Sequence, residues 1–281
     1  MITATEISER AATRFLWLDL TRKCQLQCGH CYNSSGPEGT HGTMTRDDWI
    51  SVLDQATCCG VGGVQFIGGE PTLHPHAVEL VEYALSLGLR AEVFTNLVSV
   101  PGVWWELFQR DGVSLRTSYY SDQPDEHKTV TGRPSHQRTR ENIIKSVKLG
   151  IPLRVGIIAT RDAQRIDAAR RDLEVLGVRD IRVDSTRPFG RAAADQEPDP
   201  ARLCGGCGFG RAAIGPDGTV SPCVMSGWMG VGKVQEESLA DILGGVTMSH
   251  AKAIIQAMTG GPDEDDECTP GFPGSGCSPR N

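Results

Sequence analysis

Three cysteines lie within eight positions of one another near the start of the chain. The stretch TRKCQLQCGHCYN, residues 21–33, places Cys24, Cys28 and Cys31 at a spacing of three and then two intervening residues. A structural zinc site takes four protein ligands, and the next cysteines along the chain belong to a different predicted element. Three thiolates that hold a 4Fe–4S cluster instead leave one iron open for a substrate or cofactor. We therefore interpret the three cysteines as ligands of such a cluster, with a zinc knot or buried thiols as the alternative.

The remaining seven of the ten cysteines fall into two groups. Two of them, Cys58 and Cys59, end a predicted helix and are interpreted as packing thiols. The other five lie beyond residue 200, after a long stretch without cysteine, so we expect two separate thiol sites, one near each end of the chain. The five are Cys204, Cys207, Cys223, Cys268 and Cys277.

Composition argues against several classes of protein. The 281 residues carry a net charge of −7, and lysine and arginine form no basic run, so no nucleic-acid partner is expected. The apolar runs fall short of the roughly 20 residues that span a bilayer, so no membrane is expected either. Residues 1–14 show no signal peptide. We expect the cytoplasm, where thiols stay reduced.

Short apolar segments alternate with amphipathic ones over residues 15–186. This alternation predicts parallel βαβ units, with the active site at the carboxyl ends of the strands, where the loop of Cys24 begins. The predicted fold class is α/β, and six units predict a partial (β/α)6 barrel rather than a closed eightfold one. The predicted strands are 15–20, 64–67, 91–96, 113–120, 153–160 and 181–186, and the predicted helices are 45–59, 75–87, 103–110, 135–150 and 163–177.

The composition changes after the barrel, which divides the chain into four predicted parts. Residues 204–281 are too short and too rich in glycine for much of a core, so we expect them to depend on a bound metal group. Within them, IGPDGTVSPC (214–223) predicts a hairpin that turns at PDG, and residues 237–257 predict one or two short helices. The predicted parts are an N-terminal extension (1–14), the barrel (15–190), a linker (191–203) and a C-terminal module (204–281).

The cysteine spacing resembles the signature of the radical S-adenosylmethionine (SAM) superfamily. The segment QFIGGEPTLHP, residues 65–75, follows the second predicted strand and resembles the Gly-Gly-Glu-Pro segment that binds the amino group of SAM in that superfamily. Glycines let backbone carbonyls approach an ammonium group, and Glu70 can offset its charge. The resemblance covers roughly residues 15–190, implies the same partial barrel, and makes Gly68, Gly69, Glu70 and Pro71 candidate cofactor-binding residues.

The resemblance implies further contacts with SAM. The residue before the third cysteine, here His30, lies near the adenine in that superfamily, although an ordinary loop histidine is the alternative. Ser118 on the fourth strand is our candidate for the ribose, with Asn96 on the third strand as a second one. Arg133, in VTGRPS, resembles an arginine that faces the SAM carboxylate, and a solvated loop arginine is its alternative.

The resemblance also implies a reaction. SAM binds the open iron, and an electron from the reduced cluster cleaves the sulfonium C–S bond of SAM. The resulting 5′-deoxyadenosyl radical abstracts a hydrogen from the substrate. In this interpretation the cofactor supplies the chemistry, and the protein supplies orientation and exclusion of water. An electron donor such as ferredoxin or flavodoxin is then a required partner.

The C-terminal cysteines resemble the opening of the twitch and SPASM modules. Ten residues separate Cys207 from Gly218, and four separate Gly218 from Cys223. The resemblance implies an auxiliary 4Fe–4S cluster with four of the five cysteines as ligands and one spare, and a zinc ribbon-like staple is the alternative. Which thiol is spare stays open, because Cys204 also fits the motif. We assign Cys207, Cys223, Cys268 and Cys277 as ligands and Cys204 as the candidate hydrogen donor to a substrate radical.

Two substrate classes follow from the resemblance. Residues 118–153 and RPFGRAA (187–193) are similar to the corresponding stretches of peptide maturases, which favours crosslinking, thioether formation or epimerisation in a ribosomally made peptide. About fourteen residues precede the first strand, so a separate leader-peptide-binding protein is expected. The alternative is an epimerase or dehydrogenase for an aminosugar or aminocyclitol in antibiotic biosynthesis, and a non-catalytic iron–sulfur carrier is a third class.

Overall fold

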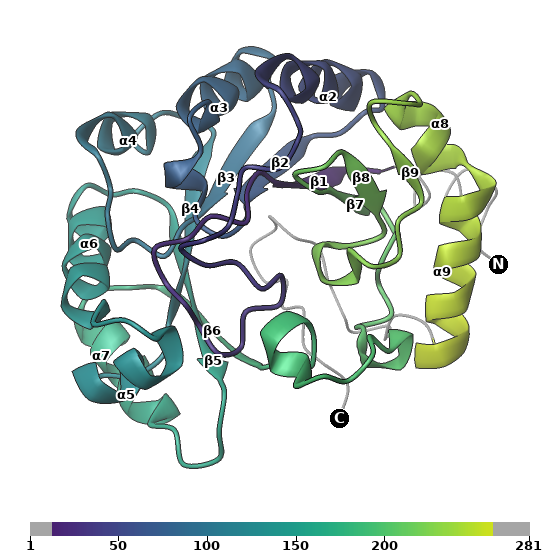
Figure 1. Ribbon diagram of the computed structural model, residues 1–281. Coiled ribbons are helices and arrows are strands. Elements are labelled where there is room, and N and C mark those ends of the chain that lie inside the picture. The colour runs from purple at the N-terminus through teal and green to yellow at the C-terminus, as the bar shows by residue number, and fades with distance from the viewer. Residues whose placement is uncertain (1–12, 261–281) are drawn as a thin grey trace, which may run out of the picture.

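The computed structural model describes residues 13–260, in which nine strands form one sheet (Figure 1). The strand order is β6-β5-β4-β3-β2-β1-β7-β8-β9, and all neighbours from β6 to β7 are parallel. The strands are β1 (Phe15–Asp19), β2 (Gly63–Ile67), β3 (Arg90–Phe94), β4 (Val113–Tyr119), β5 (Leu153–Ala159), β6 (Asp180–Ser185), β7 (Arg211–Ile214), β8 (Thr219–Ser221) and β9 (Gly232–Lys233).

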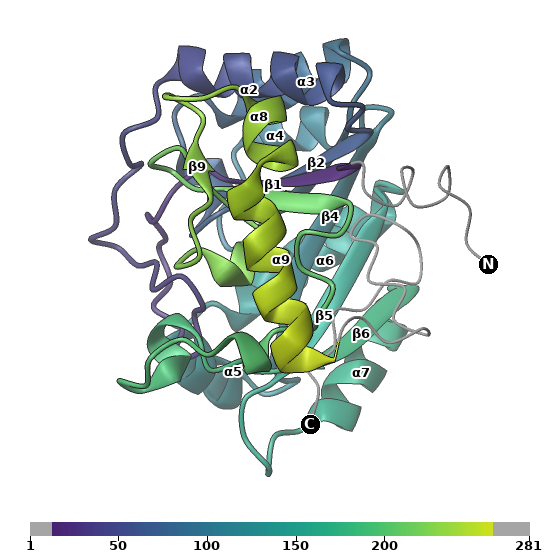
Figure 2. The ribbon, with the colours of Figure 1, turned by 90° about the vertical axis from the view of Figure 1, so that its right-hand side faces the viewer.

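Helices lie around the outside of the curved sheet, as Figure 1 shows. Those of the barrel are α2 (Arg46–Cys58), α3 (Ala77–Ser86), α4 (Gly102–Leu107), α5 (Pro124–Thr131), α6 (His136–Lys148) and α7 (Ile166–Val175). The C-terminal segment adds α8 (Leu239–Gly244) and α9 (Val246–Thr259), which run down one side of the molecule (Figure 2). Four 3₁₀ helices complete the described elements: η1 (Pro71–Leu73), η2 (Gly190–Ala193), η3 (Pro200–Arg202) and η4 (Val224–Ser226).

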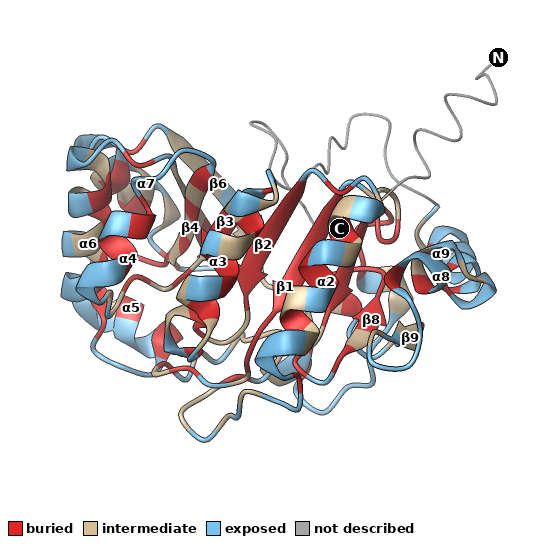
Figure 3. Ribbon diagram, turned by 90° about the horizontal axis from the view of Figure 1, so that it is seen from above, coloured by how far each residue is buried: buried red, intermediate tan, exposed pale blue. Residues whose placement is uncertain are grey.

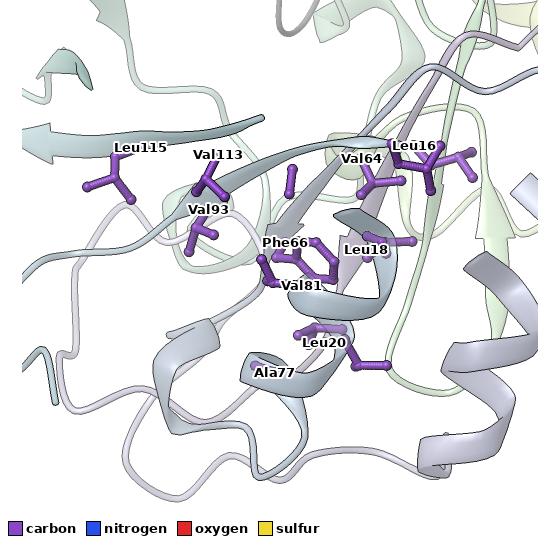
Figure 4. Close-up of a cluster of buried hydrophobic side chains, with 14 of the residues drawn as sticks. Leu16, Leu18, Leu20, Val64, Phe66, Ala77, Val81, Val93, Val113 and Leu115 are labelled. Atoms are coloured by element: carbon purple, nitrogen blue, oxygen red, sulfur yellow. The ribbon is translucent and has the colours of Figure 1, made fainter. Parts of the chain in front are cut away.

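Apolar side chains on one face of the strands meet the helices and form the core. Leu18 of β1 and Phe66 of β2 are fully buried there with Val81 of α3 (Figure 4). Alternate residues of a strand point to opposite faces, and the outer surfaces of α2 and α3 are exposed while their inner surfaces are buried (Figure 3). This packing leaves the concave face of the sheet free for other side chains.

The expected partial barrel is confirmed. All six predicted strands are present within one or two residues of their expected bounds, and they pair in parallel in the order of the chain. Gly88 and Gly150 follow the ends of α3 and α6 with positive φ angles of 78° and 69°, as expected of helix-ending glycines. The hairpin at PDG is also present, formed by β7 and β8 with Gly218 at φ 80°.

Two features of the fold were not predicted. Helix α5 has the polar sequence PDEHKTVT, which carries little helical apolar spacing, yet it buries His127, Val130 and Thr131. The hairpin of the C-terminal segment continues the barrel sheet, because β7 pairs in parallel with β1, with Phe15 beside Arg211 and Leu18 beside Ile214. The segment also shares the main core, to which it contributes Val220, Leu239 and Ile242 among others.

No helix within residues 13–260 is both long and apolar enough to cross a membrane.

Phe66→Ala tests the core between β2 and the outer helices. The Phe66 side chain is fully buried, and removal of a buried phenyl ring leaves a cavity that costs about 3–5 kcal/mol of unfolding free energy. We expect a large drop in the denaturant midpoint measured by circular dichroism. Val175→Ala is the matched control, because Val175 is 83% exposed and should change stability by less than about 0.5 kcal/mol. Equal midpoints for the two variants would contradict this account of the core.

Candidate active site

A pocket lies where the loops after the first strands of the sheet meet. Cys24, Cys28 and Cys31 line it from the loop after β1, and Gly68 and Gly69 line it from the loop after β2. The structure thus brings the two sequence motifs to one site. Three more predicted residues, His30, Asn96 and Ser118, also line this pocket.

Backbone hydrogen bonds hold the cysteine loop against the end of α5. The amide of Gln27 donates to the carbonyl of Thr131 at 3.0 Å, and the amide of Gly29 donates to that of Val130 at 3.1 Å. The last carbonyls of a helix have no partner within the helix, so they are available to a neighbouring loop. The unpredicted helix α5 therefore positions the loop that carries the three thiols.

Arg191 is a second anchor of the cysteine loop, and sequence reasoning did not assign it a role. Its Nε donates to the carbonyl of Cys28 at 2.8 Å, and its Nη2 donates to the carbonyl of Ser35 at 2.7 Å. Its own amide donates to the carbonyl of Cys31 at 3.0 Å. The sequence signal for this residue is the segment RPFGRAA (187–193), whose resemblance to peptide maturases assigns no role to its second arginine.

Gly68 and Gly69 are explained by the close approach of two backbone segments. A Cβ at Gly68 would lie 2.6 Å from the carbonyl oxygen of Thr21, and one at Gly69 would lie 2.4 Å from that of Lys23. The amide of Gly69 donates to the Thr21 carbonyl at 2.7 Å, and that of Glu70 donates to the Lys23 carbonyl at 2.9 Å. The glycines thus seat the loop after β2 directly on the start of the cysteine loop.

Glu70 is fully buried and joins the ends of β2 and β3. Its carboxyl group accepts hydrogen bonds from the amide of Asn96 at 2.8 Å, the amide of Thr72 at 3.1 Å and the hydroxyl of Thr72 at 2.8 Å. Burial raises the pKa of this carboxyl, and the hydrogen bonds act in the opposite direction. Glu70 and the adjacent buried Pro71 are not among the residues that line the pocket.

Of the predicted contacts with the adenine and the carboxylate of SAM, His30 lines the pocket and Arg133 does not. The His30 ring packs edge-on against Tyr120, with 5.1 Å between centroids, and its buried Nδ1 has no hydrogen-bond partner among the described residues. Burial, with a smaller effect of Arg191, lowers the pKa of His30 to about 4, so the ring is neutral at pH 7. Arg133 is exposed and does not line the pocket.

The three thiols suit a positively charged group with several metal atoms. Burial raises the pKa of Cys24 and of Cys28 to about 12, so they become thiolates only when a cation compensates the charge. Among residues 13–260, no three histidine, cysteine or acidic side chains are arranged to hold a single metal ion. A 4Fe–4S cluster distributes its thiolates over different iron atoms, so the donor set fits a cluster better than one zinc ion.

A second group of thiols lies in the C-terminal segment. Cys204, Cys207 and Cys223 are buried in one apolar cluster with Phe15 and Trp17 of β1. Hydrogen bonds that the Cys207 thiol donates to Cys204 and Cys223 raise the pKa of Cys207. None of these three thiols lines the pocket of Cys24, and the two other predicted ligands, Cys268 and Cys277, lie outside the described residues.

The side chain of Tyr32 lies between the two groups of thiols. It follows Cys31 directly, lines the pocket, and packs against the apolar cluster of Cys223. Its hydroxyl is buried with no hydrogen-bond partner among the described residues, and burial raises its pKa well above the ordinary value. A neutral phenol therefore separates the two sites.

Comparisons with known proteins agree with this arrangement. Residues 18–168 match the radical SAM superfamily, and residues 204–270 match the SPASM iron–sulfur cluster-binding domain. A PqqA peptide cyclase of Streptomyces rochei is 30% identical over 193 residues, which span 66% of this chain and about half, 52%, of the relative. The PqqA peptide cyclase of Xanthomonas axonopodis pv. citri is 27% identical over 270 residues, which span 80% of this chain and 72% of that relative.

The fold is also that of a solved structure. The crystal structure of Streptococcus suis SuiB bound to its precursor peptide SuiA superposes with a TM-score of 0.71 at 16% identity, covering 88% of this chain and 68% of SuiB. At this identity the likeness concerns the fold alone.

Arg191→Gln tests the anchor of the cysteine loop. The variant loses charge-assisted hydrogen bonds to the carbonyls of Cys28 and Ser35, each of which contributes about 1.5–3 kcal/mol. We expect the purified protein to hold less iron and to release it faster to a chelator, as followed by absorbance. Arg202→Gln is the control, because Arg202 is exposed on η3. Iron retention equal to that of the control would contradict the anchoring role.

Proposed function

The chain belongs to the radical SAM superfamily, and on that premise we propose that it modifies a ribosomally made peptide by radical chemistry. The observation that carries the proposal is the single pocket lined by Cys24, Cys28 and Cys31 together with the glycines of the GGEP segment. When bound, the cluster and SAM supply a 5′-deoxyadenosyl radical that abstracts a hydrogen atom. The protein is an iron–sulfur enzyme with a SPASM domain.

Each part of the pocket has a proposed task. The three thiolates hold the cluster, and the backbone of Gly68 and Gly69 approaches the amino group of SAM. The neutral ring of His30 offers a flat face to the adenine, beside Tyr120. Asn96 and Ser118 line the pocket and are assigned to the ribose. The buried carboxyl group of Glu70 accepts a hydrogen bond from the backbone amide of Asn96. Glu70 thereby positions this edge of the site.

We propose that Cys204, Cys207 and Cys223 are three ligands of the auxiliary cluster. The support for Cys204 is its contact with Cys207 within one buried apolar cluster. Cys204 does not line the pocket of Cys24, which favours a ligand over a hydrogen donor. The fourth ligand is then Cys268 or Cys277, and the other of these two is the spare thiol.

A peptide substrate is supported by the relatives and by the fold. The relatives from Streptomyces rochei and Xanthomonas axonopodis pv. citri are PqqA peptide cyclases, and SuiB was solved with a precursor peptide. We propose a peptide crosslink, thioether or epimerisation as the outcome, with ferredoxin or flavodoxin as the electron donor and a separate leader-peptide-binding protein as a partner. The thiols that both clusters require fit the reducing cytoplasm.

Replacement of Cys24, Cys28 and Cys31 by alanine tests the SAM-binding cluster. Two 4Fe–4S clusters hold about eight irons, and the triple variant should hold about four. We expect formation of 5′-deoxyadenosine from SAM to stop, as measured by anaerobic iron analysis, EPR and chromatography. The control is Cys58→Ala, because Cys58 is exposed on α2. A triple variant that still cleaves SAM would refute the assignment.

Cys204→Ala distinguishes a cluster ligand from a hydrogen donor. As a ligand, its loss should remove or destabilise the auxiliary cluster, so that iron falls from about eight toward about four per chain. Formation of 5′-deoxyadenosine should persist, because the three thiols of the first site remain. Full iron content and an unchanged EPR spectrum of the auxiliary cluster would instead support the role of hydrogen donor.

A further inference from the structure

The concave face of the sheet carries charged residues where a closed barrel would have an apolar core. Alternation along the strands places Gln65 of β2, Arg116 of β4 and Arg154 of β5 on the face opposite the helices, and all three line one cavity. On the same strands, Phe66 and Val155 point to the helices and are fully buried. The interior of this partial barrel is therefore a chamber in which arginine side chains stand among apolar ones such as Ile67 and Phe94.

The chamber adjoins the SAM pocket. Ile67, Phe94, Ile158 and Asp184 line both spaces, as does Tyr32. A molecule bound in the chamber would therefore present its neighbouring atoms to the pocket of Cys24. This is the position that a substrate of the proposed reaction must occupy.

Arginine dominates the charged lining of the chamber. Three acidic side chains pair with four of the arginines: Glu92 with Arg116, Asp180 with Arg154 and Arg182, and Asp184 with Arg187. The carboxylates are thus fewer than the guanidinium groups, and the lining carries a net positive charge although the whole chain carries −7. The five arginines that line the chamber are Arg116, Arg154, Arg170, Arg182 and Arg187.

Two of these arginines have donors to spare. The Nη2 of Arg116 is buried without a hydrogen-bond acceptor in the described part of the chain, although the Nε of the same residue lies 2.9 Å from Glu92. Arg170 of α7 lines the chamber at the open edge beside β6 and has no ion pair to a described residue. A buried guanidinium donor without an acceptor is costly, and a guanidinium binds a carboxylate through two parallel hydrogen bonds.

We propose that this arginine-lined chamber binds a carboxylate of the peptide substrate and so fixes which residue faces the radical. The inference rests on the proposed function and adds the substrate class, an acidic peptide. The carboxylate comes from an aspartate or glutamate side chain or from the C-terminus. A cationic aminosugar, the alternative substrate, would meet guanidinium groups of like charge in the same space.

Binding of short capped peptides to the full-length, anaerobically reconstituted protein with SAM tests the proposal. The probes are acetyl-Ala-Gly-Glu-Gly-Ala-amide and its glutamine analogue, compared by isothermal titration calorimetry at low salt. We expect the glutamate probe to bind about tenfold more tightly, which corresponds to about 1.4 kcal/mol. The preference should fall below about threefold in Arg116→Gln and in Arg170→Gln. Equal binding of the two probes to wild type would overturn the inference.

Matched variants separate the chamber from general charge and from misfolding. Arg171→Gln removes one positive charge from the same helix, but Arg171 is exposed and does not line the chamber, so the preference should stay at about tenfold. Arg170 is partly exposed, so its variant should fold even if Arg116→Gln does not. A preference that persists in Arg170→Gln and in a folded Arg116→Gln, or that falls equally in Arg171→Gln, would contradict the proposal.

Two further binding measurements distinguish failure of the carboxylate site from failure of the proposed peptide substrate. A glutamine probe with a free C-terminus that binds as tightly as the glutamate probe would identify the terminal carboxylate as the source. Glutarate that binds in an Arg170-dependent way while both peptides fail to bind would support the carboxylate site and count against a peptide substrate. Equal binding of both capped probes, together with turnover of a peptide, would leave the function standing and refute the chamber's role.

Discussion

The site depends on how an irregular loop of 26 residues, 20–45, is held in place between β1 and α2. The cysteine loop has little secondary structure of its own, so its backbone groups must find partners elsewhere. The guanidinium of Arg191 donates two hydrogen bonds to carbonyls of the cysteine loop. Carbonyls at the end of α5 accept hydrogen bonds from two amides of that loop, and the glycines after β2 let a neighbouring backbone segment lie against it. These contacts come from segments distant in sequence, and together they hold the loop whose three thiols face one pocket.

The two faces of the sheet carry different kinds of side chain. The outer face carries the apolar residues that pack on the helices and stabilise the fold. The inner face does not have to pack against helices. The six barrel strands, extended by β7, β8 and β9, form an open curved sheet and not a closed barrel filled by side chains. Charged residues such as Arg116 and Arg154 can therefore persist inside without disturbing the main core.

Local patterns predicted much of this molecule, and long-range contacts account for what they missed. The strands and most helices follow from apolar periodicity, and the cysteine and glycine motifs led to one pocket. Helix α5 escaped because its polar residues lack that periodicity, and Arg191 escaped because it contacts Cys28 from 163 positions away. The carboxyl of Glu70 faces Asn96 and Thr72 rather than the pocket, which no motif indicates. The parallel pairing of β7 with β1 likewise joins segments that share no local pattern.

That pairing has a consequence for electron transfer. Strand β1 leads into the cysteine loop at its carboxyl end, and along its side it bonds to β7, whose hairpin carries Cys223 beyond β8. The separation of the two sets of thiols is thus fixed by the hydrogen bonds of adjacent strands, with the ring of Tyr32 between them, and not by a hinge. Redox groups held at these thiols would therefore sit at two places on one continuous sheet, with the ring of Tyr32 between them.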